Sequence, residues 1–256
     1  MTKVLKWRVA SAAAGFLLTA VALLLPQAAG AQELSLSLGE GGSLTGRSVQ
    51  LIALITVLSL APGIAVTVTC FPFIVTVLSI LRQAIGLQQS PPNMLIVSLA
   101  LFLTFFVMEP VFTQSWEQGV SPMIAEEMDL PEAFPRIVGP FRAFMAARLD
   151  PETYAAMAAL RSEGPGPAVD PLVGPDAPLS VLVPSFMLSE IARAFQIGFL
   201  VFLPFLIIDL VIAAVLMSMG MMMVPPAIVS LPFKLSFFVL ADGWSLIAGS
   251  LVRSYF

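Results

Sequence analysis

The chain has 256 residues, a formal net charge of −4, 58% hydrophobic residues and only 11% charged residues. Its mean hydropathy of +0.96 is far above that of an ordinary soluble domain, which indicates an integral membrane protein. There is no histidine and one cysteine, which excludes a histidine-based triad and an internal disulfide and argues against a zinc cluster.

The first 31 residues have the pattern of a signal peptide. A basic start precedes a short apolar core at 15–25, and Ala29, Gly30 and Ala31 form a small-residue cleavage pattern. We therefore expect residues 1–31 to be removed after Ala31, so that the mature chain begins outside the cytoplasm. The alternative is an uncleaved first membrane anchor.

The next two segments differ sharply in composition. Residues 32–48 are rich in glycine and predict a flexible periplasmic lead-in. Residues 49–112 predict an N-terminal hydrophobic helical hairpin, in which the apolar run 49–81 is too long for one straight span. We expect that run to bend or break at Pro62 and Pro72.

Residues 113–180 predict an acidic, water-facing domain, because they hold ten acidic residues against four arginines. One short helix is well specified within it. Asp150 is placed to cap the helix, Pro151 suits its first position and Gly164 lies past its end. A second helix is expected over 140–149. With the mature N-terminus outside, this basic-poor domain is expected to be periplasmic.

Residues 181–256 predict a C-terminal hydrophobic hairpin whose tip is rich in methionine. Pro225 and Pro226 cannot continue a helix, so 220–226 is expected to be a loop. Polar backbone is tolerated at membrane depth only where it is buried in protein or lines a cavity. The loop is therefore expected to face a lumen, and the alternative is that it forms only the apolar tip of a hairpin.

Five charged residues lie in apolar surroundings, where an unpaired charge is costly: Glu190, Arg193, Asp209, Lys234 and Asp242. Glu190 has the simplest local explanation, an ion pair with Arg193 one helical turn away. Lys234 has no acidic residue within a turn, so its partner is distant in sequence or on another subunit. Asp209 has no basic residue within four positions, and it carries a proton, binds a cation or pairs across an interface.

These residues allow three classes of function. An ion-coupled transporter would use Asp209 and a helix broken at Pro204. An intramembrane hydrolase is the weakest reading, because no catalytic motif accompanies the carboxylates. Four apolar segments without an inverted repeat are few for a transporter, which favours a subunit of an oligomeric pore.

Several stretches carry a resemblance to a known family. The run "FLPFLIIDLVIAAVLMSMGMMMVPPAIVSLPFKLSFFVLADGWSL" closely resembles the C-terminal half of the FliP/SctR family of type III secretion export gate proteins. "PPNMLIVSLALFLTFFVMEPVF" and "LVPSFMLSEIARAFQIGF" extend the match over most of the chain beyond the signal peptide.

The resemblance implies a fold and a setting. The fold would be all-α, with bent helical hairpins and a small helical periplasmic domain. Several copies, five in the family picture, would assemble with FliQ and FliR, beside components such as FlhA and FlhB. The gate would lie in the flagellar basal body at the bacterial inner membrane, largely at its periplasmic face. Unfolded flagellar proteins would pass through it, and the alternative is a virulence (injectisome) secretion system.

The resemblance also implies roles for particular residues. Met221, Met222 and Met223 would form a gasket that seals the closed pore, and Glu190 and Lys234 would join adjacent subunits. It gives no role for Asp209. No catalytic residue, cofactor, metal site or nucleic-acid partner is expected.

Two positions depart from the family pattern. Phe73 follows Pro72 where relatives usually carry a Thr-Arg pair, and Glu109 stands where a small residue is common. The pairing made by that arginine is not carried over to this chain, and a compensating contact between Glu109 and a basic residue of a neighbouring copy is a hypothesis.

Overall fold

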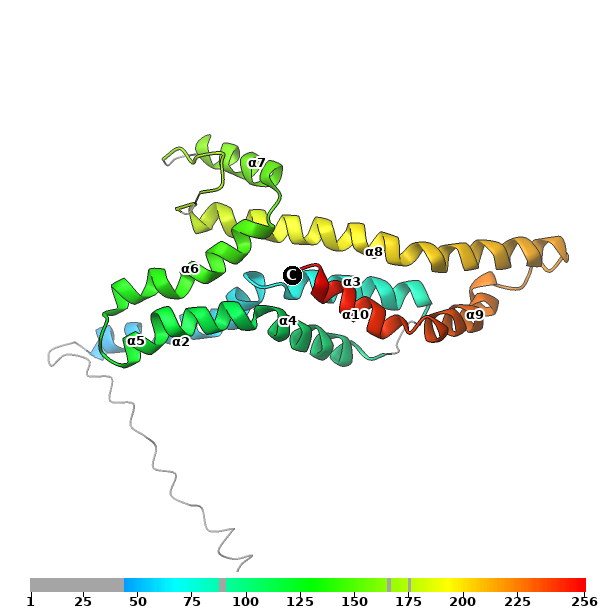
Figure 1. Ribbon diagram of the computed structural model, residues 1–256, viewed down its shortest axis with the longest axis horizontal. Helices are drawn as coiled ribbons and strands as arrows, with labels where there is room; N and C mark the ends of the chain where they lie inside the picture. Colours follow the sequence, from blue (N-terminus) through cyan, green and yellow to red (C-terminus); the bar gives the residue numbers. More distant parts are fainter. Residues whose placement is uncertain (1–43, 88–90, 165–166, 175) are drawn as a thin grey trace, which may run out of the picture. The chain divides into compact units, whose positions relative to one another are not determined.

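The computed structural model describes residues 44–87, 91–164, 167–174 and 176–256 (Figure 1). The predicted signal peptide and residues 32–43 of the predicted lead-in lie outside the described residues. The chain divides into two compact units, Met1–Thr56 and Val57–Phe256. The described part of the first unit is the beginning of helix α2, and the remaining elements belong to the second unit.

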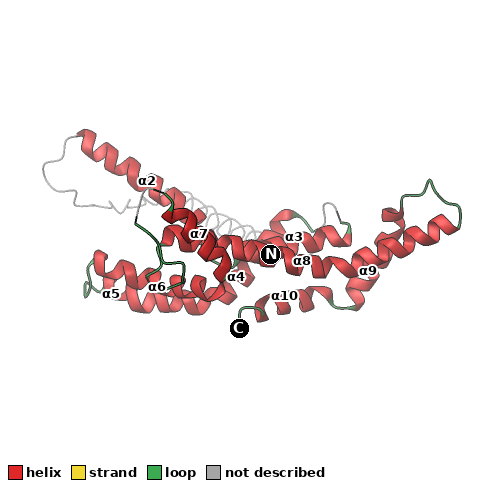
Figure 2. Ribbon diagram, turned by 90° about the horizontal axis from the view of Figure 1, so that it is seen from above, coloured by secondary structure: helices red, strands yellow, loops and turns green. Residues whose placement is uncertain are grey.

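Every regular element in the described residues is a helix (Figure 2), which confirms the all-α prediction. The helices, in chain order, are α2 (Leu44–Thr67), α3 (Phe71–Ile85), α4 (Asn93–Ser115), the π-helix η1 (Trp116–Val120), α5 (Ser121–Ile124), α6 (Leu130–Arg148), α7 (Pro151–Ser162), α8 (Leu179–Ser218), α9 (Pro226–Leu240) and α10 (Gly243–Arg253).

Two stretches of helix are long and apolar enough to cross a membrane, Asn93–Ile124 and Leu179–Ser218. Two bent helix pairs, α2 with α3 and α9 with α10, pass the same test when each pair is taken together. Length and composition therefore support an integral membrane protein. Helix α8 ends at Ser218 and α9 begins at Pro226, so a short loop joins these two helices.

The prolines break fewer helices than the sequence indicates. Pro62 lies inside α2, Pro204 lies inside the continuous α8, and Pro232 lies inside α9. The broken helix at Pro204 that a transporter would need is therefore absent, because α8 is continuous there. The run 49–81 breaks between α2 and α3, just before Pro72, and not at Pro62. Proline is tolerated inside membrane helices because neighbouring groups can satisfy the freed carbonyls.

The sharp bend near the end of the chain falls elsewhere. Helices α9 and α10 meet at an angle of 61°, at a break that contains Asp242. Asp242 adopts a left-handed conformation with φ 47°, and the hydroxyl of Ser245 donates to its carboxylate over 3.0 Å. A residue in this conformation ends one helix and redirects the chain into the next.

Helix α3 forms the centre of the main hydrophobic core. One face of it is fully buried against α8 and α4, and it consists of Phe73, Ile74, Val77, Leu78 and Leu81. Apolar residues recurring at such spacings bury one continuous face of a helix. Figure 1 shows α3 alongside the middle of α8.

A second hydrophobic cluster joins the acidic region to α8. It contains Met145 of α6, Tyr154 of α7, and Leu182 and Phe186 of α8. The acidic helices therefore pack on the first turns of α8, and residue 180 is not a packing boundary.

Helix α7 has the bounds that the sequence predicts. Pro151 is its first residue, and the Asp150 carboxylate accepts a hydrogen bond of 2.9 Å from the backbone N–H of Thr153. The Thr153 hydroxyl donates to the same oxygen over 2.8 Å. These two bonds, that of the hydroxyl first, lower the pKa of the Asp150 carboxyl.

Gly198 allows α3 and α8 to approach closely, and this yields a first prediction. A Cβ at position 198 would lie 2.4 Å from Cδ1 and 3.1 Å from Cγ2 of Ile80. Gly198→Ala is expected to destabilise the protein by about 1–3 kcal/mol, measured by chemical unfolding in detergent. Adding Ile80→Val, which removes Cδ1, should recover part of the loss.

Gly139 provides the matched control, because a Cβ on it would meet nothing within 4 Å. Gly139→Ala in helix α6 should be neutral or slightly stabilising. Equal stability of the Gly198→Ala and Gly139→Ala variants would show that the α3–α8 contact is not tight.

The cap of α7 yields a second prediction. The pKa of Asp150 is lower in the folded than in the unfolded chain, so its stabilisation is present above pH of about 4 and is lost as the pH falls through the lowered value. Amide exchange in α7 should therefore accelerate in acid. Asp150→Asn, which caps without titrating, should remove that dependence on pH, whereas the same acid response in this variant would assign it to another group.

Candidate gate loop and buried charges

The methionine-rich loop lies between α8 and α9, as predicted, and begins with a glycine stop. Gly220 adopts a left-handed conformation with φ 76°, and its N–H donates to the carbonyl of Met217 over 3.0 Å. The N–H of Met221 donates to the carbonyl of Leu216, also over 3.0 Å. This pair of bonds is a Schellman motif, which satisfies the last carbonyls of a helix.

Two prolines determine the other end of the loop. Pro225 caps α9 in an extended conformation, and Pro226 takes the first helical position, where no N–H is needed. The loop therefore ends one residue earlier than predicted. Gly220 is a sequence signal for the end of α8, but the loop was predicted from the two prolines alone.

The methionine side chains project from the loop into open space in this chain. Met222 is 84% and Met223 97% exposed, whereas Met221 is 38% exposed. Exposed apolar side chains are common on the membrane-length helices of this chain, and at Met222 and Met223 they continue onto the loop past the end of α8. Most of the surface of Met222 and Met223 is therefore not covered by other residues of the chain.

Lys234 lies in a polar cluster between α8, α9 and α3. Its Nζ donates to Oδ2 of Asp209 over 2.6 Å and to the carbonyl of Ala84 over 3.1 Å. The Ser230 hydroxyl donates to the other oxygen of Asp209 over 2.6 Å. The Lys234 side chain is 8% exposed and that of Asp209 is 32% exposed.

This cluster answers two open questions from the sequence. The partner of Lys234 is distant in sequence but lies in the same chain. Asp209 has its cation in Lys234, so neither a bound metal nor a carried proton is needed to explain its charge. No group of three or more histidine, cysteine, aspartate or glutamate residues within the described ranges could hold a metal ion.

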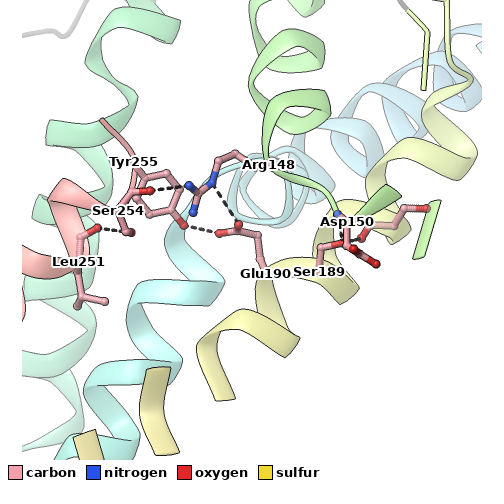
Figure 3. Close-up of polar contacts among 8 residues, drawn as sticks. Arg148, Asp150, Ser189, Glu190, Leu251, Ser254 and Tyr255 are labelled. Carbon is pink, nitrogen blue, oxygen red and sulfur yellow. Dashed lines mark hydrogen bonds and ion pairs between the residues drawn. The ribbon is translucent and has the colours of Figure 1, made fainter. Parts of the chain in front are cut away.

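Glu190 lies in a second cluster, where α8 meets the end of α6 (Figure 3). It is fully buried, and its Oε1 lies 3.6 Å from Nε of Arg148. The hydroxyl of Tyr255, just past α10, donates to its Oε2. The local pairing with Arg193 is therefore wrong as the main contact, because the ion pair is made with a residue of another helix.

Arg148 and Tyr255 are site residues that the sequence reasoning missed. Arg148 belongs to the acidic region, and Tyr255 follows the last apolar helix. A signal was present, since a buried glutamate requires a cation, but four arginines of the acidic region were equally available. Glu190 and Lys234 belong to separate clusters, and their contacts with neighbouring copies stay a prediction.

The two departures from the family pattern occupy different settings. Phe73 is fully buried, and its ring lies edge-on to that of Tyr255, with 5.5 Å between ring centroids. An apolar ring thus fills the core at this position. Glu109 lies on an exposed part of α4.

Comparisons with known proteins agree on one family. The FliP family matches residues 54–251. The chain is 54% identical to the flagellar biosynthetic protein FliP of Caulobacter vibrioides, over 91% of this chain and 86% of that protein. It is 47% identical to that of Agrobacterium fabrum, over 94% and 98% of the two chains, and 45% identical to that of Bacillus subtilis, over 81% and 92%.

The Lys234–Asp209 pair yields a third prediction. Lys234→Met or Asp209→Asn alone should each cost about 1–3 kcal/mol, less than for a fully buried pair because Asp209 is partly exposed. The double variant should cost less than the sum of the two, which a double-mutant cycle in detergent would measure.

The exposed pair of Glu132 and Arg136 offers a matched control on one turn of α6. Its side chains are 62% and 52% exposed, so its coupling should be only about 0.3–0.5 kcal/mol. If the coupling energy of Lys234 and Asp209 is as small as this, the pair does not contribute appreciably to the stability of the fold.

Proposed function

The chain belongs to the FliP family, and from this premise we propose that it is a pore-forming subunit of the flagellar type III protein export gate. Family membership and the apolar helices make it a membrane-embedded component of the flagellar export apparatus. The finer proposal is that unfolded flagellar proteins pass through a pore that several copies of the chain, five in the family picture, build together.

The observation that carries the proposal is the exposure of Met222 and Met223 at the end of the α8–α9 hairpin. A loop of polar backbone with apolar, flexible side chains is poorly suited to lipid, but it suits the inside of a protein ring. Methionine has three rotatable bonds and a soft sulfur, so it can pack against surfaces of different shape.

The proposed mechanism follows from these properties. In the closed state, Met221, Met222 and Met223 of neighbouring copies pack together and exclude water, so ions cannot cross. An unfolded chain entering the pore displaces the side chains, which then repack around it. The loop needs no catalytic group for this task.

We also propose that Glu190 and Lys234 lie where neighbouring copies meet. In the lone chain each charge has an ion-pair partner and Glu190 is fully buried, so the contact between copies uses the exposed polar atoms of the neighbouring residues in each cluster. Asp209, with one third of its side chain exposed, offers such a surface beside Lys234. FliQ and FliR would complete the gate, beside FlhA and FlhB, largely at the periplasmic face of the inner membrane.

The other functional classes receive less support. An ion-coupled transporter required a free Asp209 and a helix broken at Pro204, but Asp209 pairs with Lys234 and α8 is continuous. A role in virulence secretion is less favoured, because the compared relatives carry flagellar names.

A fourth prediction tests the seal. Replacing Met221, Met222 and Met223 with alanine should shorten the side chains that fill the closed pore, so ion leakage across the inner membrane should rise severalfold while export continues. Membrane potential and swimming motility, measured in the same cells, would report the two effects.

Exposed methionines elsewhere provide the control. Met94, 80% exposed at the start of α4, and Met217, 61% exposed near the end of α8, can be replaced by alanine together. This variant should not leak. Unchanged ion permeability in the triple variant would contradict the seal and favour the alternative that the loop is only the apolar tip of a hairpin.

A further inference from the structure

Three helices converge on Tyr255 (Figure 3). Its hydroxyl donates to Glu190 of α8, and the guanidinium carbon of Arg148, at the end of α6, lies 4.0 Å from its ring centroid. The ring of Phe73 of α3 meets it edge-on, and the ring of Phe144 of α6 stacks on it with 6.0 Å between centroids. One side chain thus contacts both hydrophobic clusters of the chain.

The residue before it adds a main-chain contact. Nη1 of Arg148 donates to the carbonyl of Ser254 over 2.5 Å. Arg148 therefore holds the segment after α10 by a hydrogen bond to its backbone and by a cation–π contact with its ring. This segment, Ser254–Phe256, is called the strap below.

The ion pair beneath the strap is incompletely hydrogen-bonded. Nε and Nη2 of Arg148 and Oε1 of Glu190 are buried without hydrogen-bond partners in the described part of the chain. The 3.6 Å between Nε and Oε1 is an ion-pair distance, but it is too long for a hydrogen bond. The direction of the carboxylate is therefore not determined by Arg148 alone.

We propose that Tyr255 is a positioning residue, whose hydroxyl orients the Glu190 carboxylate toward Arg148 and thereby holds the base of the acidic region on α8. The base is the junction where α6 ends and α7 begins, and the backbone N–H of Asp150 there donates to the Ser189 hydroxyl of α8 over 2.9 Å. The strap thus ties the last apolar helix to the acidic region. This role goes beyond the export function and does not depend on it.

The hydroxyl remains a donor over a wide range of pH. Burial, together with the neighbouring Glu190 carboxylate, raises the pKa of Tyr255 well above its ordinary value. The tyrosine therefore keeps its proton at neutral and mildly alkaline pH, and the strap holds the junction without responding to such changes.

Tyr255→Phe provides the sharpest test, because it removes the hydroxyl and keeps the ring in the core. Amide hydrogen exchange would be followed by mass spectrometry on the full chain in detergent. We expect amides of 148–153 to exchange about tenfold faster, since a buried carboxylate loses its donor. The exchange rates of amides around Lys234 should be unchanged. Faster exchange over the whole chain, or unchanged exchange at 148–153, would overturn the proposal.

A second pair of variants separates the hydroxyl's effect on Glu190 from packing of the ring. In a Glu190→Gln background the charge is gone, so Tyr255→Phe should change the exchange of 148–153 by less than about twofold. A tenfold change in both backgrounds would mean that Tyr255 acts by packing, which contradicts the proposal. Phe256→Ala, at the exposed neighbouring position, should leave exchange unchanged.

Discussion

A charged side chain in apolar surroundings must find a partner, and α8 carries one such carboxylate in each half. Glu190 in its first half pairs with Arg148, and Asp209 in its second half pairs with Lys234. The first pair joins α8 to the end of α6, and the second joins it to α9. The long apolar helix thus has its neighbours fixed by charge at two points, while packing against α3 fills the length between them.

In this arrangement the acidic region shares a hydrophobic cluster with α8. Its helices bury their apolar faces on the first turns of α8, through Tyr154 and Phe186 among others, and Arg148 closes the junction. A movement of the acidic region would therefore change its contacts with α8 and with the strap. Methionine loop and acidic region lie toward opposite ends of the same helix (Figure 1).

The sequence predicts those features that depend on neighbouring residues. The bounds of α7 follow from Asp150 and Pro151, and the loop before α9 follows from Pro225 and Pro226, because caps and proline act within one turn. The run 49–81 breaks before Pro72, whereas Pro62 lies inside α2, because the tolerance of proline in a helix depends on packing that no local pattern reports.

The partners of the buried charges could not be predicted from neighbouring residues either, because they are determined by tertiary packing. Arg193 is the nearest cation to Glu190 in sequence, yet Arg148 reaches it because the fold brings the end of α6 to α8. Tyr255 is 65 positions from Glu190, and its contact exists only after α10 has packed. The sequence shows that Glu190 needs a partner, and the tertiary structure decides which one it has.

In the loop between α8 and α9, the residues that determine the course of the backbone differ from those that form the exposed surface. Its course is fixed by Gly220 at one end and the paired prolines at the other, through main-chain geometry alone. The exposed side chains at 222 and 223 take no part in holding that course. Substitutions at 222 and 223 can therefore change the size and flexibility of the exposed side chains without changing the course of the backbone.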